Sequence, residues 1–224
     1  MRDDERLAGL HVIVDDPEVA DAVLRGGGRV VQVRLKTGTD RQRLAVVAAV
    51  VERCRSASAM CIVNDRLDLA LAAGAAGVHL GADDLPVAVA RSLAPSAFVI
   101  GATARDVDTA RRLCTDGASY IGAGAVWETE SKSGLPPPIG LSGLEAIAHG
   151  VDAPVVAIAG ITLTLVPEVL ATGAAGIAVL GAVRRASDAT EATRALVDAI
   201  DRHKATITTG SSSSPRDPLA GRKA

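Results

Sequence analysis

Residues 60–84 read MCIVNDRLDLALAAGAAGVHLGADD and contain one complete unit of strand, helix and strand. The apolar run 60–64 predicts a buried strand, and the Ala- and Leu-rich stretch after it predicts a helix that ends at Gly74. A second buried strand is expected at 77–80, directly after this glycine. The same order of helix, glycine and strand recurs along the chain, as in GGGRVVQV, DGASYIG and GAAGIAVL.

Eight such units are expected before residue 205. The predicted strands lie near 10–14, 29–35, 60–64, 77–80, 98–101, 119–123, 154–159 and 176–180. Amphipathic or Ala-rich helices such as 40–55 separate them. This pattern favours a single α/β domain, a (β/α)8 TIM barrel over residues 1–204. A doubly wound open sheet is the alternative, but no G-x-G-x-x-G motif follows the first strand. Residues 205–224 are rich in Ser, Pro and Gly and predict a disordered tail.

The composition narrows the class of protein. Hydrophobic residues make up 48% of the 224 residues and aromatic residues only 1%, so the core must consist of Val, Leu, Ile and Ala. A net charge of -2 without a basic run argues against a nucleic-acid partner. No segment resembles a signal peptide or a membrane span, which predicts a cytoplasmic protein with no membrane partner. The three cysteines, Cys54, Cys61 and Cys114, are expected to be reduced, and the sequence leaves a homo-oligomer open.

Basic residues follow the second predicted strand, and barrel active sites lie at the C-terminal ends of strands. Gln32, Arg34 and Lys36 alternate along this strand and therefore share one of its faces. Two neighbouring cations that face the barrel interior are unfavourable unless an anion lies between them, and a polyphosphate would suit this position. The alternative is that Lys36 ends the strand and points into water.

Acidic and amide side chains follow the third and fourth strands. Asn64 and Asp65 end the third strand, and Asp84 follows the fourth. A few carboxylates, completed by water and phosphate oxygens, are the ligands that Mg²⁺ prefers. The alternative is that Asp65 and Asp84 cap the helices that follow them.

Hydroxyl groups and a lysine occupy two further strand ends. Thr103 follows the fifth strand, and Thr129, Ser131 and Lys132 lie in the loop after the sixth. This loop is a candidate phosphate or substrate clamp, although many loops have a similar composition.

Glycines follow the last two strands. Gly160 lies after the seventh strand, and Leu180 and Gly181 form the turn after the eighth. Backbone N–H groups at this place often bind phosphate in barrels, whereas the alternative is that the glycines only permit tight turns.

These residues, in this order, resemble the thiamine-phosphate synthase family. The motifs that carry the resemblance are Gln32-x-Arg34-x-Lys36, Asn64-Asp65-Arg66-x-Asp68-x-Ala70 and the run from Gly74 to Asp84. Each motif alone is weak, but the ordered set is specific, and it extends from about residue 10 to about residue 185.

The resemblance implies a transferase that joins 4-amino-2-methyl-5-pyrimidinylmethyl diphosphate to a thiazole phosphate. The products would be thiamine phosphate and pyrophosphate, with Mg²⁺ as cofactor. The residues matched to the pyrimidine diphosphate site are Gln32, Arg34, Lys36, Asn64, Thr103 and Lys132. Those matched to the thiazole phosphate site are Thr129, Ser131, Gly160, Leu180 and Gly181. Asp65 and Asp84 match the Mg²⁺ ligands. Arg34, Lys36 and Lys132 would be catalytic, stabilising charge on the departing diphosphate.

Three positions depart from the family pattern. Ala82 replaces a Gln, Ala159 replaces the first Gly of a G-G-I turn, and Gly181 replaces a Ser. The last two are expected to alter the thiazole phosphate site alone, on the assumption that the two substrates meet opposite sides of the rim.

Two alternatives remain within the same superfamily. A thiazole tautomerase would share the loop motif E-T-x-x-K-x-G-L, but its histidine before that loop is Ala125 here. A non-catalytic barrel that binds a thiamine precursor would not need the aspartate pair. Both residue patterns favour the synthase.

Overall fold

The structure is a computed structural model that describes residues 6–128 and 136–210, the side chains of 207–210 excepted. Its strands are β1 (Gly9–Val14), β2 (Val30–Val33), β3 (Met60–Asn64), β4 (Gly77–Leu80), β5 (Val99–Ala104), β6 (Tyr120–Ala123), β7 (Val155–Ile158) and β8 (Gly176–Val179). They pair in parallel in chain order and close into a barrel, with β8 beside β1. The predicted barrel is confirmed, and the open sheet is wrong.

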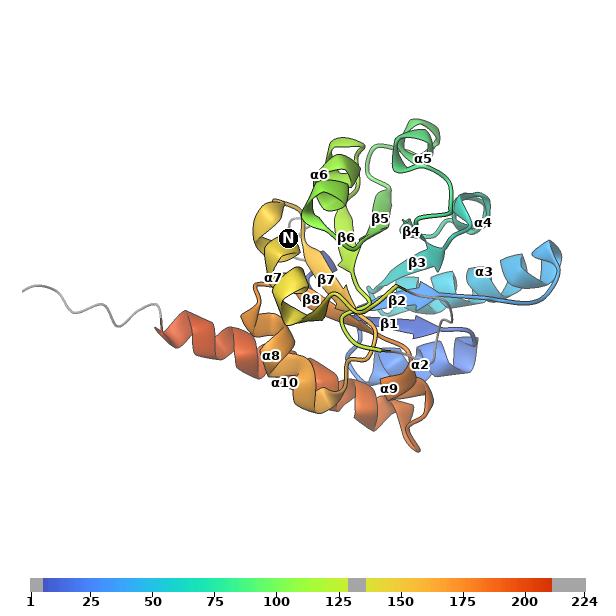
Figure 1. Ribbon diagram of the computed structural model, residues 1–224. Helices are drawn as coiled ribbons and strands as arrows, with labels where there is room; N and C mark the ends of the chain where they lie inside the picture. Colours follow the sequence, from blue (N-terminus) through green and yellow to red (C-terminus); the bar gives the residue numbers. More distant parts are fainter. Residues whose placement is uncertain (1–5, 129–135, 211–224) are drawn as a thin grey trace, which may run out of the picture.

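Helices cover the outside of the barrel (Figure 1). They are α2 (Pro17–Arg25), α3 (Asp40–Ser56), α4 (Leu67–Ala73), α5 (Val87–Leu93), α6 (Val107–Thr115), α7 (Gly140–Gly150), α8 (Val166–Ala171), α9 (Gly181–Arg184) and α10 (Ala189–Gly210), with a 3-10 turn, η1 (Leu163–Leu165). None of the described helices is long and apolar enough to cross a membrane.

Local sequence signals set the ends of these helices. Thr39 and Gln42 form a capping box at the start of α3, where each side chain accepts the other residue's backbone N–H. Gly74 ends α4 with φ +66°, a left-handed conformation that glycine adopts without steric cost. Strand β4 can therefore begin three residues later and return to the barrel beside β3.

The C-terminal boundary differs from the prediction. The tail was expected to begin at residue 205, but α10 continues to Gly210. Residues 205–209 contain neither Gly nor Pro, so no residue there breaks the helix, and the Thr206 hydroxyl donates to the Arg202 carbonyl one turn earlier. The remaining residues of the predicted tail, 211–224, lie outside the described part of the chain.

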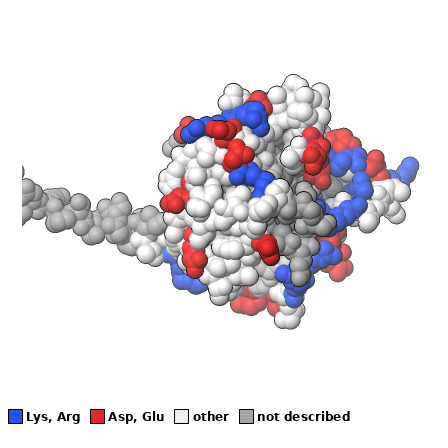
Figure 2. Space-filling view, viewed as in Figure 1, with Lys and Arg blue, Asp and Glu red and all other residues white. Residues whose placement is uncertain are grey.

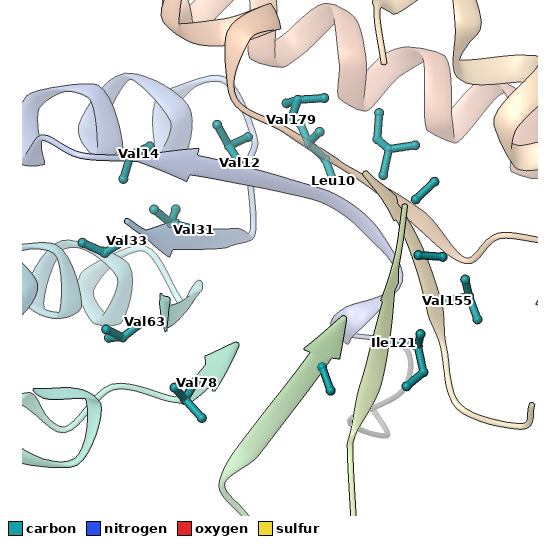
Figure 3. Close-up of a cluster of buried hydrophobic side chains, with 14 of the residues drawn as sticks. Leu10, Val12, Val14, Val31, Val33, Val63, Val78, Ile121, Val155 and Val179 are labelled. Atoms are coloured by element: carbon teal, nitrogen blue, oxygen red, sulfur yellow. The ribbon is translucent and has the colours of Figure 1, made fainter. Parts of the chain in front are cut away.

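Alternation along the strands separates two apolar layers. One layer lies between strands and helices and includes Val12, Val31, Val63 and Val78 (Figure 3). The second fills the inside of the barrel and is built from Leu7, Val30, Met60, Ile62, Val99, Tyr120, Val156 and Ala178. All three cysteines are free, and Cys54 and Cys61 are buried. Consecutive residues of one strand therefore pack into different apolar layers.

Tyr120 is the largest side chain inside the barrel, and it fits because its neighbour on β5 is a glycine. Gly101 pairs directly with Tyr120 in the parallel ladder. A Cβ added at Gly101 would lie 2.1 Å from the Tyr120 ring carbon Cζ. The ring fills the space that a side chain at position 101 would need.

Replacing Gly101 by alanine should therefore disrupt the interior. We expect Gly101→Ala to lower the free energy of unfolding by about 3 kcal/mol or more, because a buried ring must move in a close-packed core. Urea denaturation measures the change. Gly140→Ala is the control: no heavy atom lies within 4 Å of its added Cβ, so only the strain of its φ of +64° applies, about 1 kcal/mol. Equal losses in the two variants would contradict this packing.

His11 is a second polar group inside the barrel. Its Nε2 lies 2.8 Å from the Leu7 carbonyl oxygen and its ring lies edge-on to Tyr120, with the two ring centres 5.2 Å apart. Burial lowers the pKa of His11 to about 4, and the bond to the Leu7 carbonyl opposes this shift only in part. His11 is therefore neutral at neutral pH and donates through Nε2.

The depressed pKa of His11 makes stability depend on pH. The unfolded chain binds the proton near pH 6.5 and the folded protein only near pH 4. The stabilising contribution is therefore complete above pH 6.5 and is lost as the pH falls toward 4. We expect His11→Gln to remove about 2 kcal/mol of the stability loss between about pH 7.5 and pH 5. Urea unfolding at both pH values checks this, and identical losses in the two proteins would refute it.

Candidate active site

The inner face of the barrel carries a chain of hydrogen bonds that ends at the rim. Tyr120 Oη lies 2.9 Å from His79 Nδ1, and His79 Nε2 lies 3.0 Å from Thr103 Oγ1. Gln32 also hydrogen-bonds Tyr120 from the side of β2. Burial raises the pKa of Tyr120 and lowers that of His79 to about 4, so both groups are neutral at neutral pH.

This chain of bonds places two predicted substrate residues at different depths. Gln32 is only 4% exposed and lies below the rim against Tyr120. Thr103 is half-buried at the end of β5, and His79 fixes the position of its hydroxyl. The link between Gln32 and Thr103 through Tyr120 and His79 has no signal in the sequence, because it joins side chains of four strands across the interior of the folded barrel.

A cationic cavity of about 540 Å³ lies at the ends of β1, β2 and β8. Its charged lining residues are Arg34, Lys36, Arg184, Arg185 and Asp15, and its lining also includes Leu180 and Gly181. Figure 2 shows Lys and Arg side chains gathered on the side of the molecule where α3 and α9 lie in Figure 1. Four cations and one carboxylate make this cavity suited to phosphate groups.

The cavity brings together residues that were predicted for different substrates. Arg34 and Lys36, predicted for the diphosphate, line the same space as Leu180 and Gly181, predicted for the thiazole phosphate. Residues predicted for two different substrates therefore border one cavity, and the division of the rim between the substrates stays a prediction. Barrel closure is the cause, because β8 and β2 are both neighbours of β1.

Neither Asp65 nor Asp84 caps a helix, so the alternative reading of this pair is wrong. Helix α4 has Arg66 at its N-cap and α5 has Pro86, and neither N-cap makes a side-chain hydrogen bond. Asp65 has φ +66°, and its backbone N–H donates to the His79 carbonyl at 2.8 Å. Asp84 Oδ2 accepts the Gly81 N–H at 2.6 Å, which orients this carboxylate within its own turn.

The acidic residues do not form a metal site by themselves. In residues 6–128 and 136–210, no three His, Cys, Asp or Glu side chains are grouped closely enough to hold an ion. The available oxygens are those of Asn64 and Asp65, at the end of β3, and of Asp84, which follows β4 at the same end of the barrel. Such a set needs oxygens from a phosphate ligand or from water to complete the coordination of Mg²⁺.

Arg66, which belongs to the same sequence motif as Asn64 and Asp65, forms an ion-pair network. Its guanidinium bonds Asp40 of α3 at 2.7 Å and both carboxylate oxygens of Asp68. This guanidinium holds the pKa of Asp40 and of Asp68 below the usual range. Exposed pairs of this kind add little stability, and here they link α3 to the start of α4.

The turn after β7 lies against the segment that follows β6. Val126 N–H donates to the Ile158 carbonyl at 3.0 Å, and a Cβ added at Gly160 would lie 2.5 Å from Trp127 Cβ. Gly160 also has φ +73°, so both its conformation and its space require glycine. Its predicted role in phosphate binding is compatible with this structural role.

Arg105 joins the two described ends of the loop between β6 and α7. Its guanidinium donates to the Gly124 carbonyl at 3.0 Å and to the Pro137 carbonyl. Thr129, Ser131 and Lys132 lie outside the described residues, so their predicted positions are not tested. Sequence reasoning missed Arg105 because a lone arginine after a strand carries no recognisable pattern.

Comparison with known proteins shows which sequences resemble this chain. A family model described as thiamine monophosphate synthase matches residues 10–183. The chain belongs to this family.

Individual relatives are similar over almost their whole length. The thiamine-phosphate synthase of Salinispora arenicola (strain CNS-205) is 48% identical over 203 residues, which cover 87% of this chain and 98% of that protein. The Salinispora tropica thiamine-phosphate synthase is 51% identical over 76% of this chain and 83% of its own. The solved thiamine phosphate pyrophosphorylase from Pyrococcus furiosus is 36% identical with a TM-score of 0.84, covering 90% of this chain and 99% of its own.

Ala159 is a position at which this chain departs from the pattern of the thiamine monophosphate synthase family. Where the family pattern expects the first glycine of a G-G-I turn, this chain has alanine with φ +76°. A side chain in this left-handed conformation brings Cβ close to the following carbonyl oxygen, which is unfavourable for any residue except glycine. The chain keeps the backbone of the turn but at a cost in strain.

Restoring the family glycine should relieve that strain. We expect Ala159→Gly to raise the free energy of unfolding by about 1 kcal/mol, the left-handed strain less the extra entropy of unfolded glycine. Ala157→Gly, at a fully buried position within β7, is the matched control, and it should lower stability by about 1 kcal/mol. Urea denaturation compares them, and a loss of stability in both variants would show that Ala159 is unstrained.

Proposed function

We propose that the protein joins 4-amino-2-methyl-5-pyrimidinylmethyl diphosphate to a thiazole phosphate, giving thiamine phosphate and pyrophosphate. The observation that carries this proposal is the cationic cavity bordered by Arg34 and Lys36 in a chain of this family. Asp65 and Asp84, neither of which is the N-cap residue of α4 or α5, follow the next two strands at the same end of the barrel. Cations bind phosphate oxygens directly, and carboxylates can hold a Mg²⁺ ion that binds them as well.

The reaction needs no general base on the protein. The C–O bond between the methylene carbon and the diphosphate breaks first, and the electron pair leaves with the diphosphate. The pyrimidine stabilises the resulting cation, and the thiazole nitrogen then donates its electron pair to form the C–N bond. Positive charge ends on the thiazolium ring, and no proton is transferred.

Arg34 and Lys36 would lower the barrier by holding charge on the departing diphosphate. Preorganised cations favour the state in which negative charge develops on the leaving group, without reorganising at that moment. Lys132 is proposed for the same role. Gln32, Asn64 and Thr103 are proposed contacts of the pyrimidine substrate.

Contacts of the thiazole phosphate are proposed for residues near the last three strands. They are Thr129, Ser131, Gly160, Leu180 and Gly181. Leu180 and Gly181 line the same cavity as Arg34, so the two phosphate-bearing groups would bind close together. A cytoplasmic location and a homo-oligomeric state stay predictions.

The residues present fit Mg²⁺ as a cofactor. Asp65 and Asp84 would hold it, because their carboxylates are hard oxygen ligands that the structure does not use as helix caps. When bound, Mg²⁺ would neutralise part of the diphosphate charge. The Gly81 N–H donates to Asp84 Oδ2 and so orients this carboxylate.

Neutralising either aspartate should abolish turnover without unfolding the protein. We expect Asp65→Asn and Asp84→Asn each to lower pyrophosphate release by about a hundredfold or more, and the double variant to be little worse, because both would serve one ion. The free energy of unfolding should change by less than about 1 kcal/mol. Asp108→Asn, at a side chain that is 93% exposed on α6, is the control.

A coupled assay of pyrophosphate release with both substrates and Mg²⁺ tests the proposal itself. Release should require the pyrimidine diphosphate, the thiazole phosphate and the metal together. No release from the unmodified protein would overturn the proposed function. Full Mg²⁺-dependent activity in both aspartate variants would overturn only the assignment of the metal.

A further inference from the structure

The space beside Gly181 is filled by the side chain of Arg185. A Cβ added at Gly181 would lie 2.6 Å from Arg185 Nη2 and 2.7 Å from both Nη1 and Cζ. These are three atoms of one guanidinium group, resting where a side chain at position 181 would begin. A residue larger than glycine and the guanidinium in this position therefore exclude each other.

The two neighbouring arginines after β8 differ in their partners. Arg184 Nη2 bonds Asp15 Oδ2, just past the end of β1, at 2.8 Å. No described residue forms an ion pair with Arg185, although its guanidinium lines the same cavity. Asp15 thus neutralises the charge of Arg184, whereas the Arg185 guanidinium lies against Gly181.

Glycine at position 181 and the position of the Arg185 guanidinium depend on each other, because a larger side chain at 181 would need the space that the guanidinium fills. The family pattern has a serine at 181, whose hydroxyl can give a phosphate one neutral hydrogen bond. This chain has glycine there and a guanidinium in the space above it. A guanidinium can donate two parallel bonds to a phosphate and carries a full charge.

We propose that Arg185 binds the phosphate of the thiazole substrate in this protein, taking the place of a side-chain hydroxyl at position 181. The inference rests on the proposed function, because it assumes that the thiazole phosphate binds beside Leu180 and Gly181. Arg34 and Lys36 line the same cavity, and in this assignment they hold the diphosphate of the first substrate while Arg185 holds the phosphate of the second.

This role makes Arg185 a determinant of affinity for one substrate only. We expect Arg185→Gln to raise the KM for the thiazole phosphate about tenfold or more, the usual effect of losing a charge-assisted bond. The KM for the pyrimidine diphosphate should change less than about twofold, because other cations hold that group. Arg25→Gln, an exposed arginine in the groove between α2 and α3, is the matched control and should leave both constants unchanged.

A side chain at position 181 and the Arg185 guanidinium cannot occupy the same space, and this conflict allows a second, independent measurement. In an Arg185→Ala background, Gly181→Ser should recover part of the lost thiazole phosphate affinity, because the hydroxyl then occupies the vacated space. With Arg185 present, the same serine must displace the guanidinium and should weaken binding. The free energy of unfolding should stay nearly constant in all variants, since the displaced group is the end of an exposed, flexible side chain.

The outcomes separate this inference from the proposed function. If the unmodified protein releases no pyrophosphate, the proposed function fails, and this inference fails with it. If it does release pyrophosphate but Arg185→Gln leaves the thiazole phosphate KM unchanged, or shifts both KM values equally, only the role of Arg185 is refuted. An identical effect of Gly181→Ser with and without Arg185 would refute the exchange between the two positions.

Discussion

The pairing of β8 with β1 is the contact on which the rest of the structure depends. Gly9 lies opposite Gly176, and a Cβ at Gly176 would lie 2.1 Å from the Gly9 carbonyl oxygen. Only glycine lets the first and last strands approach this closely. The closure brings the end of β2 and the end of β8 to one cavity, so cations far apart in the sequence line the same space.

The interior packing links this closure to the chemistry of the rim. The chain is poor in aromatic residues, and the one tyrosine is placed at the centre of the barrel, over Gly101 and in contact with His79. Because His79 also bonds Thr103, the packing of the core fixes a hydroxyl at the rim. Burial keeps Tyr120 and His79 neutral, so this chain of bonds orients groups and adds no charge to the site.

The sequence predicted the architecture well because parallel buried strands are continuous apolar runs bounded by glycine. The strands at 60–64 and 77–80 were predicted to the residue, and helix α3 to within one residue. The site was predicted only as a set of strand ends. The left-handed Asp65 donates its backbone N–H to His79 of the next strand, a contact that no local pattern records. The guanidinium over Gly181 belongs to Arg185, four residues later, but the sequence does not show which of the two neighbouring arginines takes this position.

The central claim is that one cavity, formed by barrel closure, holds the phosphate groups of both substrates. A crystal structure of the protein with Mg²⁺, pyrophosphate and thiamine phosphate tests it most directly. The account predicts pyrophosphate in contact with Arg34 and Lys36, and the phosphate ester of thiamine phosphate within hydrogen-bond distance of the Arg185 guanidinium. Either phosphate group bound outside this cavity, with Arg34 and Arg185 both exposed to solvent, would contradict it.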